Sequence, residues 1–322
     1  MKKIAIRLGA LLLCICICGV SAFGAEYLIP VGQIIGLELR DNRVTVAAFD
    51  EELGKNARQA GLRIGDKLLR IDGRPITCAE DVQQSLQHSQ GTITLQLQRR
   101  GKHETLILQP AITRDGPKLG IYLKEGVTGI GTVTYYDPDT GMFGALGHGV
   151  NDPDSQLLQL VRGSAYEAQV VSVNKGQAGQ PGQLRGSLIG KTPMGNLIKN
   201  TPRGLFGKAQ IPWTGKQLPI AAASEIQKGS ATILSTVSGT AVQEYSVEIL
   251  KIYPQTRGGD KNMLIHITDP RLLDATGGIV QGMSGSPIIQ DGKLVGAVTH
   301  VLVNDPTRGY GILIENMLDA AA

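Results

Sequence analysis

Short runs in which apolar and polar residues alternate recur along most of the chain, and glycine, proline, asparagine or aspartate interrupts them. Residues 92–97, Thr-Ile-Thr-Leu-Gln-Leu, form one such run, and this period of two is typical of a half-buried β-strand. The best-marked helix is expected over residues 79–88, where Val82 and Leu86 lie four apart on one face. Residues 77–80, Thr-Cys-Ala-Glu, match a capping box. The pattern predicts a mainly β protein with many turns.

The beginning of the chain has a different pattern. An apolar run over residues 8–20 follows three basic residues and precedes a group of small residues. This is typical of a secretory segment, and the run is shorter than a comfortable membrane span. Residues 1–25 are therefore expected to be a signal peptide or an N-terminal membrane anchor. Three of the four cysteines lie in this run, which leaves only Cys78 for the mature chain and excludes an intramolecular disulfide framework or a cysteine metal cluster there.

Charge, length and motif content limit the classes of function that the protein can have. The formal net charge of +4 falls to about +1 without the three basic residues of the N-terminal segment, so nothing indicates nucleic-acid binding. The 322 residues suggest two domains. No spacing typical of metal ligands and no phosphate-binding loop occurs in the sequence. We therefore predict no metal and no cofactor.

Residues 27–110 resemble a PDZ domain, a small α/β module. The resemblance is carried by residues 60–66, Ala-Gly-Leu-Arg-Ile-Gly-Asp, and residues 71–76, Ile-Asp-Gly-Arg-Pro-Ile. It implies that a loop at residues 35–39 cradles a C-terminal carboxylate, and that a peptide strand adds beside the 79–88 helix. The implied peptide-binding residues are Gly36, Leu37, Glu38, Leu39, Val82 and Leu86. Glu38 departs from the commonest glycine-rich loop, and Val82 and Leu86 could equally be plain core residues.

The second domain, residues 111–322, contains a glycine-punctuated turn at residues 281–287, Gln-Gly-Met-Ser-Gly-Ser-Pro. Such a turn can hold the hydroxyl of Ser284 outward while the backbone N–H groups of Gly282 and Ser284 form an oxyanion hole. An ordinary hairpin turn is the alternative. Ser286 is a second candidate nucleophile, but it precedes a proline and does not lie between two glycines.

A base and a carboxylate for this serine are also present. His148 has glycine on both sides, so its ring is not expected to pack as a routine core side chain. Asp269 ends a predicted strand before a proline, and Asp274 is the alternative carboxylate. The order His148, Asp269, Ser284 is that of the chymotrypsin-type triad. His300, which follows the strand after the serine, is a candidate supporting residue.

The remaining histidines and the strand count complete this picture. His266 alternates with apolar neighbours and is expected to be an ordinary strand residue, while His88 and His103 are expected at the surface. Many strands at short spacing favour a β-barrel or sandwich, with two facing barrels as one arrangement.

Together these motifs resemble the SpoIVB peptidase family of endospore-forming bacteria. The residues that carry the resemblance are 144–149, 268–270, 276–290, 296–301 and 304–306. The resemblance covers nearly the whole chain. It implies a chymotrypsin-like double β-barrel peptidase domain after the PDZ domain, with His148, Asp269 and Ser284 as the catalytic triad.

The resemblance also implies a cellular role. A serine endopeptidase of this family is exported across the forespore membrane into the space between forespore and mother cell. There it cleaves the membrane-bound regulator that holds an intramembrane metalloprotease inactive, so that a sigma-factor precursor is processed. The PDZ domain would control self-association, self-cleavage or substrate capture.

Two other functions remain open at this point. One is a non-catalytic PDZ adaptor, which the complete histidine, aspartate and serine set disfavours. The other is an acyl-ester hydrolase that uses the same triad, which the PDZ domain disfavours because such modules bind polypeptides.

Overall fold

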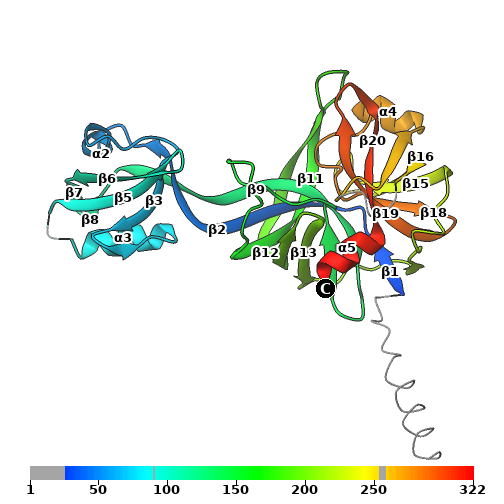
Figure 1. Ribbon diagram of the computed structural model, residues 1–322, viewed down its shortest axis with the longest axis horizontal. Coiled ribbons are helices and arrows are strands. Elements are labelled where there is room, and N and C mark those ends of the chain that lie inside the picture. The colour runs from blue at the N-terminus through cyan, green and yellow to red at the C-terminus, as the bar shows by residue number, and fades with distance from the viewer. Residues whose placement is uncertain (1–25, 90, 254–258) are drawn as a thin grey trace, which may run out of the picture.

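Two antiparallel strands of equal length join the two bodies of the molecule. They are β2 (Ile34–Phe49) and β9 (Ile121–Tyr136), and their pairing extends from Ile34 opposite Thr132 to Phe49 opposite Ile121. In Figure 1 this ribbon leaves a large body and runs into a smaller one. The computed structural model describes residues 26–89, 91–253 and 259–322, so the expected N-terminal segment lies outside the described residues. No helix within these ranges is long and apolar enough to cross a membrane.

The smaller body is the PDZ domain, built from the far halves of β2 and β9 and the chain between them. Its other elements are α2 (Lys55–Gln59), β3 (Lys67–Ile71), β4 (Arg74–Pro75), α3 (Ala79–Gln87), β5 (Ile93–Arg99), β6 (Lys102–Leu108), β7 (Ala111–Thr113) and β8 (Gly116–Lys118). The alternation in β5 is real: Ile93, Leu95 and Leu97 are fully buried, and they pack with Val82 and Leu86 of α3. The helix is amphipathic as predicted.

The cap of α3 differs from the predicted one by one residue. Cys78, not Thr77, is the N-cap, and the Asp81 carboxylate, not that of Glu80, accepts the backbone N–H groups of Thr77 and Cys78. The predicted and observed capping boxes overlap. Cys78 is the observed N-cap because its backbone is extended, as is typical of the residue that precedes the first helical turn.

The first barrel of the large body is a closed ring of six antiparallel strands. The order is β9, β10, β13, β12, β11 and β2, and the β2–β9 pair closes it. Its further strands are β10 (Met142–Ala145), β11 (Arg162–Asn174), β12 (Gln183–Thr201) and β13 (Gly204–Ala209), and the short strands β1 (Tyr27–Pro30) and β14 (Leu218–Pro219) extend its sheet. Buried apolar residues such as Ile35, Phe143 and Leu205 fill its core.

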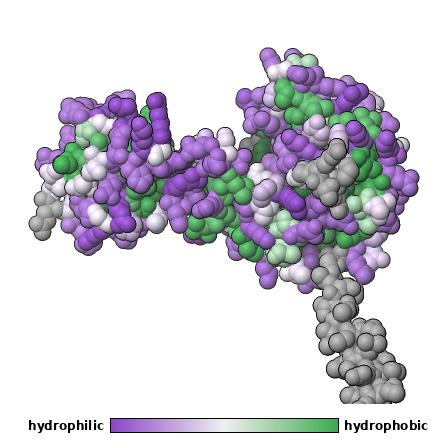
Figure 2. All heavy atoms as spheres, viewed as in Figure 1, coloured by the Kyte–Doolittle hydropathy of each residue, from purple (hydrophilic) through white to green (hydrophobic). Residues whose placement is uncertain are grey.

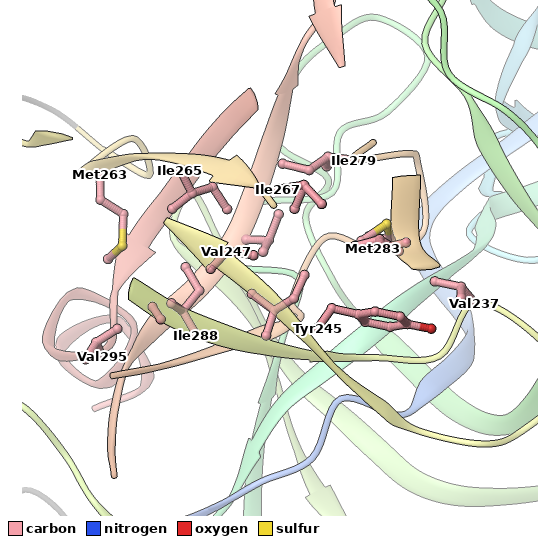
Figure 3. Close-up of a cluster of buried hydrophobic side chains, with 14 of the residues drawn as sticks. Val237, Tyr245, Val247, Met263, Ile265, Ile267, Ile279, Met283, Ile288 and Val295 are labelled. Carbon is pink, nitrogen blue, oxygen red and sulfur yellow. The ribbon is translucent and has the colours of Figure 1, made fainter. Parts of the chain in front are cut away.

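The second barrel is also closed. Its strands are β15 (Gly229–Ser235), β16 (Gln243–Ile252), β17 (Met263–Ile267), β20 (Asp305–Leu313), β19 (Lys293–Leu302) and β18 (Pro287–Gln290), in that order, and two helices flank it, α4 (Pro270–Thr276) and α5 (Ile314–Ala321). Figure 3 shows side chains of β16, β17 and β18, among them Val247, Ile265 and Ile288, meeting inside this barrel. The expected mainly β fold, with a small α/β module and a double-barrel domain, is confirmed.

The division between the two domains differs from the expected one at residues 110 and 111. Residues 27–39 pair with strands of the first barrel, and residues 111–125 return through the PDZ domain. The PDZ domain is therefore an insertion within the barrel chain, not a preceding module. An alternating pattern predicts a strand but not the strand with which it pairs. Residues 27–39 were therefore assigned to the PDZ domain, whose motifs are nearest in the sequence.

Figure 2 shows hydrophilic residues over much of both bodies, with hydrophobic groups on each body and along the lower side of the narrow connection between them. Gly126 lies in this connection at φ +70°, where a Cβ would be 1.8 Å from the Leu39 carbonyl oxygen. Only glycine allows the two strands to approach so closely at this point. The register of the β2–β9 pair shifts here, between Leu39 and Val44 of β2, and the pairing resumes beyond the shift.

Candidate active site

The turn that carries Ser284 is held between the two barrels. Thr132 of β9 donates its backbone N–H to the Ser284 carbonyl oxygen at 3.0 Å and its hydroxyl to the Gly282 carbonyl oxygen at 2.8 Å. Gly285 has φ +98°, and a Cβ there would lie 2.0 Å from the Thr132 carbonyl oxygen. The glycines of the motif are thus required by a positive φ and by close packing, and they fix the serine in place.

Two backbone donors at this turn point to an oxyanion hole. Met283 donates its N–H to the Val280 carbonyl oxygen, and Gly285 donates to that of Val298. Among the described residues, the N–H groups of Gly282 and Ser284 have no such acceptor. Two uncommitted donors beside a nucleophile are what a tetrahedral oxyanion needs, and losing one such donor typically costs about 2.7–4 kcal/mol of transition-state stabilisation.

Ser284 rather than Ser286 is the serine available for attack. Ser284 is half-buried and lines a cavity of about 530 Å³, where its hydroxyl donates to the Thr299 carbonyl oxygen at 2.8 Å. Ser286 is fully buried and donates to the hydroxyl of Ser235 at 3.0 Å. A substrate in the cavity can therefore meet only the first of the two.

His148 enters the same cavity from the first barrel. Leu146 and Gly147, which follow β10, both have a left-handed backbone, with φ +69° and φ +71°. Such a conformation costs a residue other than glycine about 1–3 kcal/mol and occurs often at functional sites. A Cβ on Gly147 would lie 2.8 Å from the Thr299 side chain, so the loop packs directly on the second barrel. This packing brings the histidine to the serine turn.

The hydrogen bond of His148 leaves its second nitrogen free for proton transfer. Nδ1 lies 2.9 Å from the Gly149 carbonyl oxygen. Because a carbonyl oxygen can only accept, Nδ1 is assigned the proton, and Nε2 keeps a lone pair. This is the tautomer that a general base facing a serine requires.

Asp269, the predicted triad acid, makes no hydrogen bond with His148 among the described residues, and its catalytic role stays a prediction. It is the N-cap of α4, and its carboxylate accepts hydrogen bonds from the backbone of Ser246 and from the backbone and guanidinium of Arg271. The hydrogen bond from the Arg271 side chain is the main cause that lowers the pKa of Asp269 to about 2. The aspartate does not line the His148 cavity, and neither does Asp274, which is exposed on α4.

The local sequence explains the contacts that Asp269 makes. Aspartate followed by proline at a strand end is also the preferred sequence of a helix start, with aspartate as N-cap and proline at the first helical position. The sequence could not separate these two roles of Asp269.

His300 is the residue that sequence reasoning undervalued. Its ring lies against that of His148, with centroids 5.3 Å apart and planes tilted by 44°, and it lines the same cavity. Its Nε2 is 3.7 Å from a carboxylate oxygen of Asp260. The sequence did indicate that His300 lies near the serine turn, because it follows Thr299 on β19, which pairs with the strand directly after that turn.

The predicted PDZ carboxylate loop also needs correction. Gly36, Leu37, Glu38 and Leu39 lie within the first barrel, where β2 pairs with β11 on one side and β9 on the other. A strand with both edges paired has no backbone donors left for a peptide, so this segment cannot cradle a carboxylate.

A groove in the PDZ domain lies instead between α3 and the beginning of β9. Its cavity of about 390 Å³ is lined by Val82 and Leu86 of the helix and by residues 117–123, Pro-Lys-Leu-Gly-Ile-Tyr-Leu. Residues 121–123 pair with β2 along one edge, and within the described ranges no strand covers the other. Val82 and Leu86 are thus at the groove and in the core at once. The apolar-Gly-apolar sequence at residues 119–121 was the missed signal.

Comparison with known proteins agrees with this site. The family model for SpoIVB peptidase S55 matches residues 115–318, and a PDZ domain model matches residues 53–99. The chain belongs to the SpoIVB peptidase S55 family. This S55 peptidase also carries a PDZ domain.

Individual relatives are more distant from this S55 peptidase. A candidate zinc metalloprotease of Rhizobium meliloti is 38% identical over 101 residues, and the match spans 31% of the chain and 26%, about a quarter, of that relative's length. The Rv3671c protease of M. tuberculosis in its active form has 15% identity and a TM-score of 0.38, over 61% of this chain and 75% of that one. The PDZ domain of the SdrC-like protein of Listeria monocytogenes has 22% identity and a TM-score of 0.23, over 26% and 87%.

Proposed function

We propose that this S55 peptidase cleaves the exposed part of a membrane-bound regulatory protein in sporulation signalling. The regulator is one that holds an intramembrane metalloprotease inactive, and its loss lets a sigma-factor precursor be processed. Family membership supports this role, and so does the resemblance of residues 276–290 to the sporulation peptidases. The site of action is the space between forespore and mother cell, reached by way of the N-terminal segment.

One observation carries the chemistry. Ser284, the lone pair of His148 Nε2 and two uncommitted N–H groups converge on one cavity between the barrels. The Ser284 oxygen attacks the scissile carbonyl carbon while Nε2 takes its proton, and the new oxyanion accepts from the N–H groups of Gly282 and Ser284. His148 then gives the proton to the leaving amine, and water hydrolyses the acyl-enzyme.

One rearrangement precedes attack. The Ser284 hydroxyl donates to the Thr299 carbonyl oxygen in the structure, so its proton must leave that acceptor and turn toward His148 Nε2.

The PDZ groove supports a polypeptide partner. Its open strand edge beside α3 suits an added peptide strand, whether from the regulator or from a second copy of the chain. We propose that substrate capture, self-association and self-cleavage all depend on this groove.

The test compares wild-type protein from residue 26 onward with Ser284→Ala. Each is incubated alone and with the exposed domain of a candidate regulator, and fragments are identified by mass spectrometry. We expect the wild type to cut the regulator and the variant to lose at least ~10³-fold in rate, since the nucleophile is gone. Equal cutting by both proteins would show that Ser284 is not the nucleophile.

Two further outcomes would favour the other functions. Binding of the regulator without any cutting would support the adaptor. Hydrolysis of ester substrates, with no protein substrate cut, would support the acyl-ester hydrolase.

A further inference from the structure

We propose that a second cavity, on the outer face of the first barrel, is a substrate-binding subsite that takes an apolar residue of the polypeptide and an acidic residue two positions away from it. The inference rests on the proposed peptidase activity and names a feature of its substrate. The cavity has a volume of about 570 Å³. Residues of β2, β9, β11 and β12 line it, among them Ile130, Tyr166, Leu188 and Lys191.

This outer cavity adjoins the cavity that contains Ser284. Leu37, Gly129 and Ile130 line both of them. A Cβ on Gly282 would lie 3.3 Å from the Cδ1 atom of Ile130, so a single side chain separates the outer cavity from a predicted oxyanion donor. A polypeptide whose scissile bond lies at Ser284 therefore needs only a short extension to reach the outer cavity.

The edge of β9 between the two cavities is open. Residues 127–131 pair with β2 on one side, and within the described ranges β10 and β1 pair with β9 only from Val133 onward. Thr128 and Gly129 are exposed, and a Cβ on Gly129 would meet no atom within 4 Å. An extended peptide can cross here without displacing a side chain. Because its successive side chains point to opposite faces, residues two apart would face the outer cavity together.

Leu188 provides the apolar half of the subsite. Its side chain lies over Gly36 of β2, where a Cβ would come within 2.1 Å of the leucine Cδ2 atom, so glycine at this position makes room for it. Leu188 is nevertheless 52% exposed. Together with Ile130 it offers apolar surface beside the open edge, and covering such surface with an apolar substrate residue stabilises the complex.

A bulge in β12 brings Lys191 to this cavity. Tyr166 of β11 pairs with Pro193 and Ala168 pairs with Leu188, so residues 189–192 lie opposite one residue of β11. Bulges often occur next to active sites, where they redirect a side chain. Lys191 lies within this bulge, is exposed and lines the cavity.

The charges around the cavity favour an acidic substrate residue. Glu38 is the one carboxylate among the described residues that line it, and it pairs with Arg40 and accepts from the Tyr166 hydroxyl. The hydrogen bond from Arg40 lowers the pKa of Glu38, and the charge of Arg162 acts in the same direction. Lys191 has no ion-pair partner in the part of the chain that the structure describes. Its charge is therefore available to a carboxylate of the substrate.

The experiment begins with the cut sites that the wild type makes in an unstructured protein, mapped by mass spectrometry. We expect the sites to be enriched in an apolar residue with Asp or Glu two positions away. A quenched fluorescent peptide from such a site is then made in three forms: unchanged, with Lys in place of the acidic residue, and with Ala in place of the apolar one. Labelling of Ser284 by a small fluorophosphonate reports on the chemistry alone, since the probe does not extend to the outer cavity.

Lys191→Glu tests the charge. We expect kcat/KM to fall about tenfold for the acidic peptide and to rise severalfold for the lysine peptide, because the variant exchanges the sign of the favourable pair. A merely structural role would not reverse the preference. Lys199→Glu is the matched control, because this exposed lysine lies on the same strand outside the cavity. The control should treat both peptides as the wild type does.

Leu188→Ala tests the apolar contact. We expect kcat/KM for the unchanged peptide to fall about five- to tenfold, mainly through a higher KM. For the peptide with Ala at the apolar position, the variant and the wild type should differ less than twofold, because the contact is already absent. Fluorophosphonate labelling of both variants should stay within about twofold of wild type, which also shows that they are folded.

Three results would overturn the subsite: wild-type cut sites without the expected pair of residues, a Lys191→Glu variant with unchanged charge preference, or a Leu188→Ala variant that loses as much with the alanine peptide as with the unchanged one. A wild type that the fluorophosphonate does not label would instead overturn the peptidase chemistry on which the subsite rests. Labelling and cleavage that ignore the two residues would overturn the subsite alone.

Discussion

Single residues in this peptidase combine structural and chemical tasks. Asp269 illustrates this, because one carboxylate caps α4, accepts from the Ser246 backbone and pairs with Arg271. The hydrogen bond from Arg271 lowers the pKa of the carboxyl from its usual 3.8 to about 2. The charged form is thus favoured by folding, and its contribution to stability is present above pH 3.8 and is lost as the pH falls toward 2.

Asp269→Ala tests this assignment. We expect the variant to lose about 1 kcal/mol of unfolding free energy at neutral pH through the missing cap. Between pH 4 and pH 2 the difference from wild type should shrink, because protonation removes the same interactions from the wild type. Thermal unfolding at several pH values measures both effects. A difference that stays constant to pH 2 would contradict the role of the charge.

The predictability of the site also differs from residue to residue. Ser284 and His148 could be predicted because their flanking glycines reflect a local backbone requirement that is visible in the sequence. His300 could be predicted only as a candidate supporting residue, because its contact with His148 depends on how the two barrels pack.

At the scale of elements, the strands were easier to predict than the strands with which they pair. Residues 92–97 alternate in the sequence and in burial, since one face of a strand contacts the core. Residues 35–37 and 119–121 share an apolar-Gly-apolar pattern, and only the second lies beside an open edge. The difference lies in long-range pairing, which no local pattern records.

Val82→Thr tests the position of the PDZ groove. The substitution keeps the side-chain shape but places a hydroxyl where the groove is apolar, so a peptide with an apolar C-terminal residue should bind about three- to tenfold more weakly. Glu38→Ala is the control, because this residue lies in the first barrel. Fluorescence anisotropy with such peptides measures the affinities. Weaker binding by the control, with Val82→Thr unchanged, would return the groove to residues 36–39.

At the scale of the whole molecule, ion pairs connect the PDZ side of the ribbon to the loop that follows His148. Arg43 of β2 lies 2.5 Å from Asp152, whose side chain is 2% exposed, and Lys67 of β3 pairs with Asp154. The Asp152 carboxylate is the buried partner, and a buried charge that loses its counter-ion is destabilising. The inserted domain and the segment next to the base are therefore mechanically connected.

Arg43→Ala should loosen this connection. We expect backbone amides of residues 150–158 to exchange hydrogen about tenfold faster, because Asp152 loses its cation and the loop opens more often. Lys55→Ala, which removes an exposed pair within the PDZ domain, is the control. Hydrogen exchange followed by mass spectrometry reports on both. Unchanged exchange in the loop would show that the ion pair does not restrain it.

The insertion of the PDZ domain between β2 and β9 has a consequence for a nicked enzyme. A single cut after β6 would divide the chain into two pieces, each of which contributes strands to the PDZ sheet and to the first barrel. The pieces would stay associated in native solution and separate only on denaturation. Truncation seen on a denaturing gel would therefore not mean that the PDZ domain has left the peptidase.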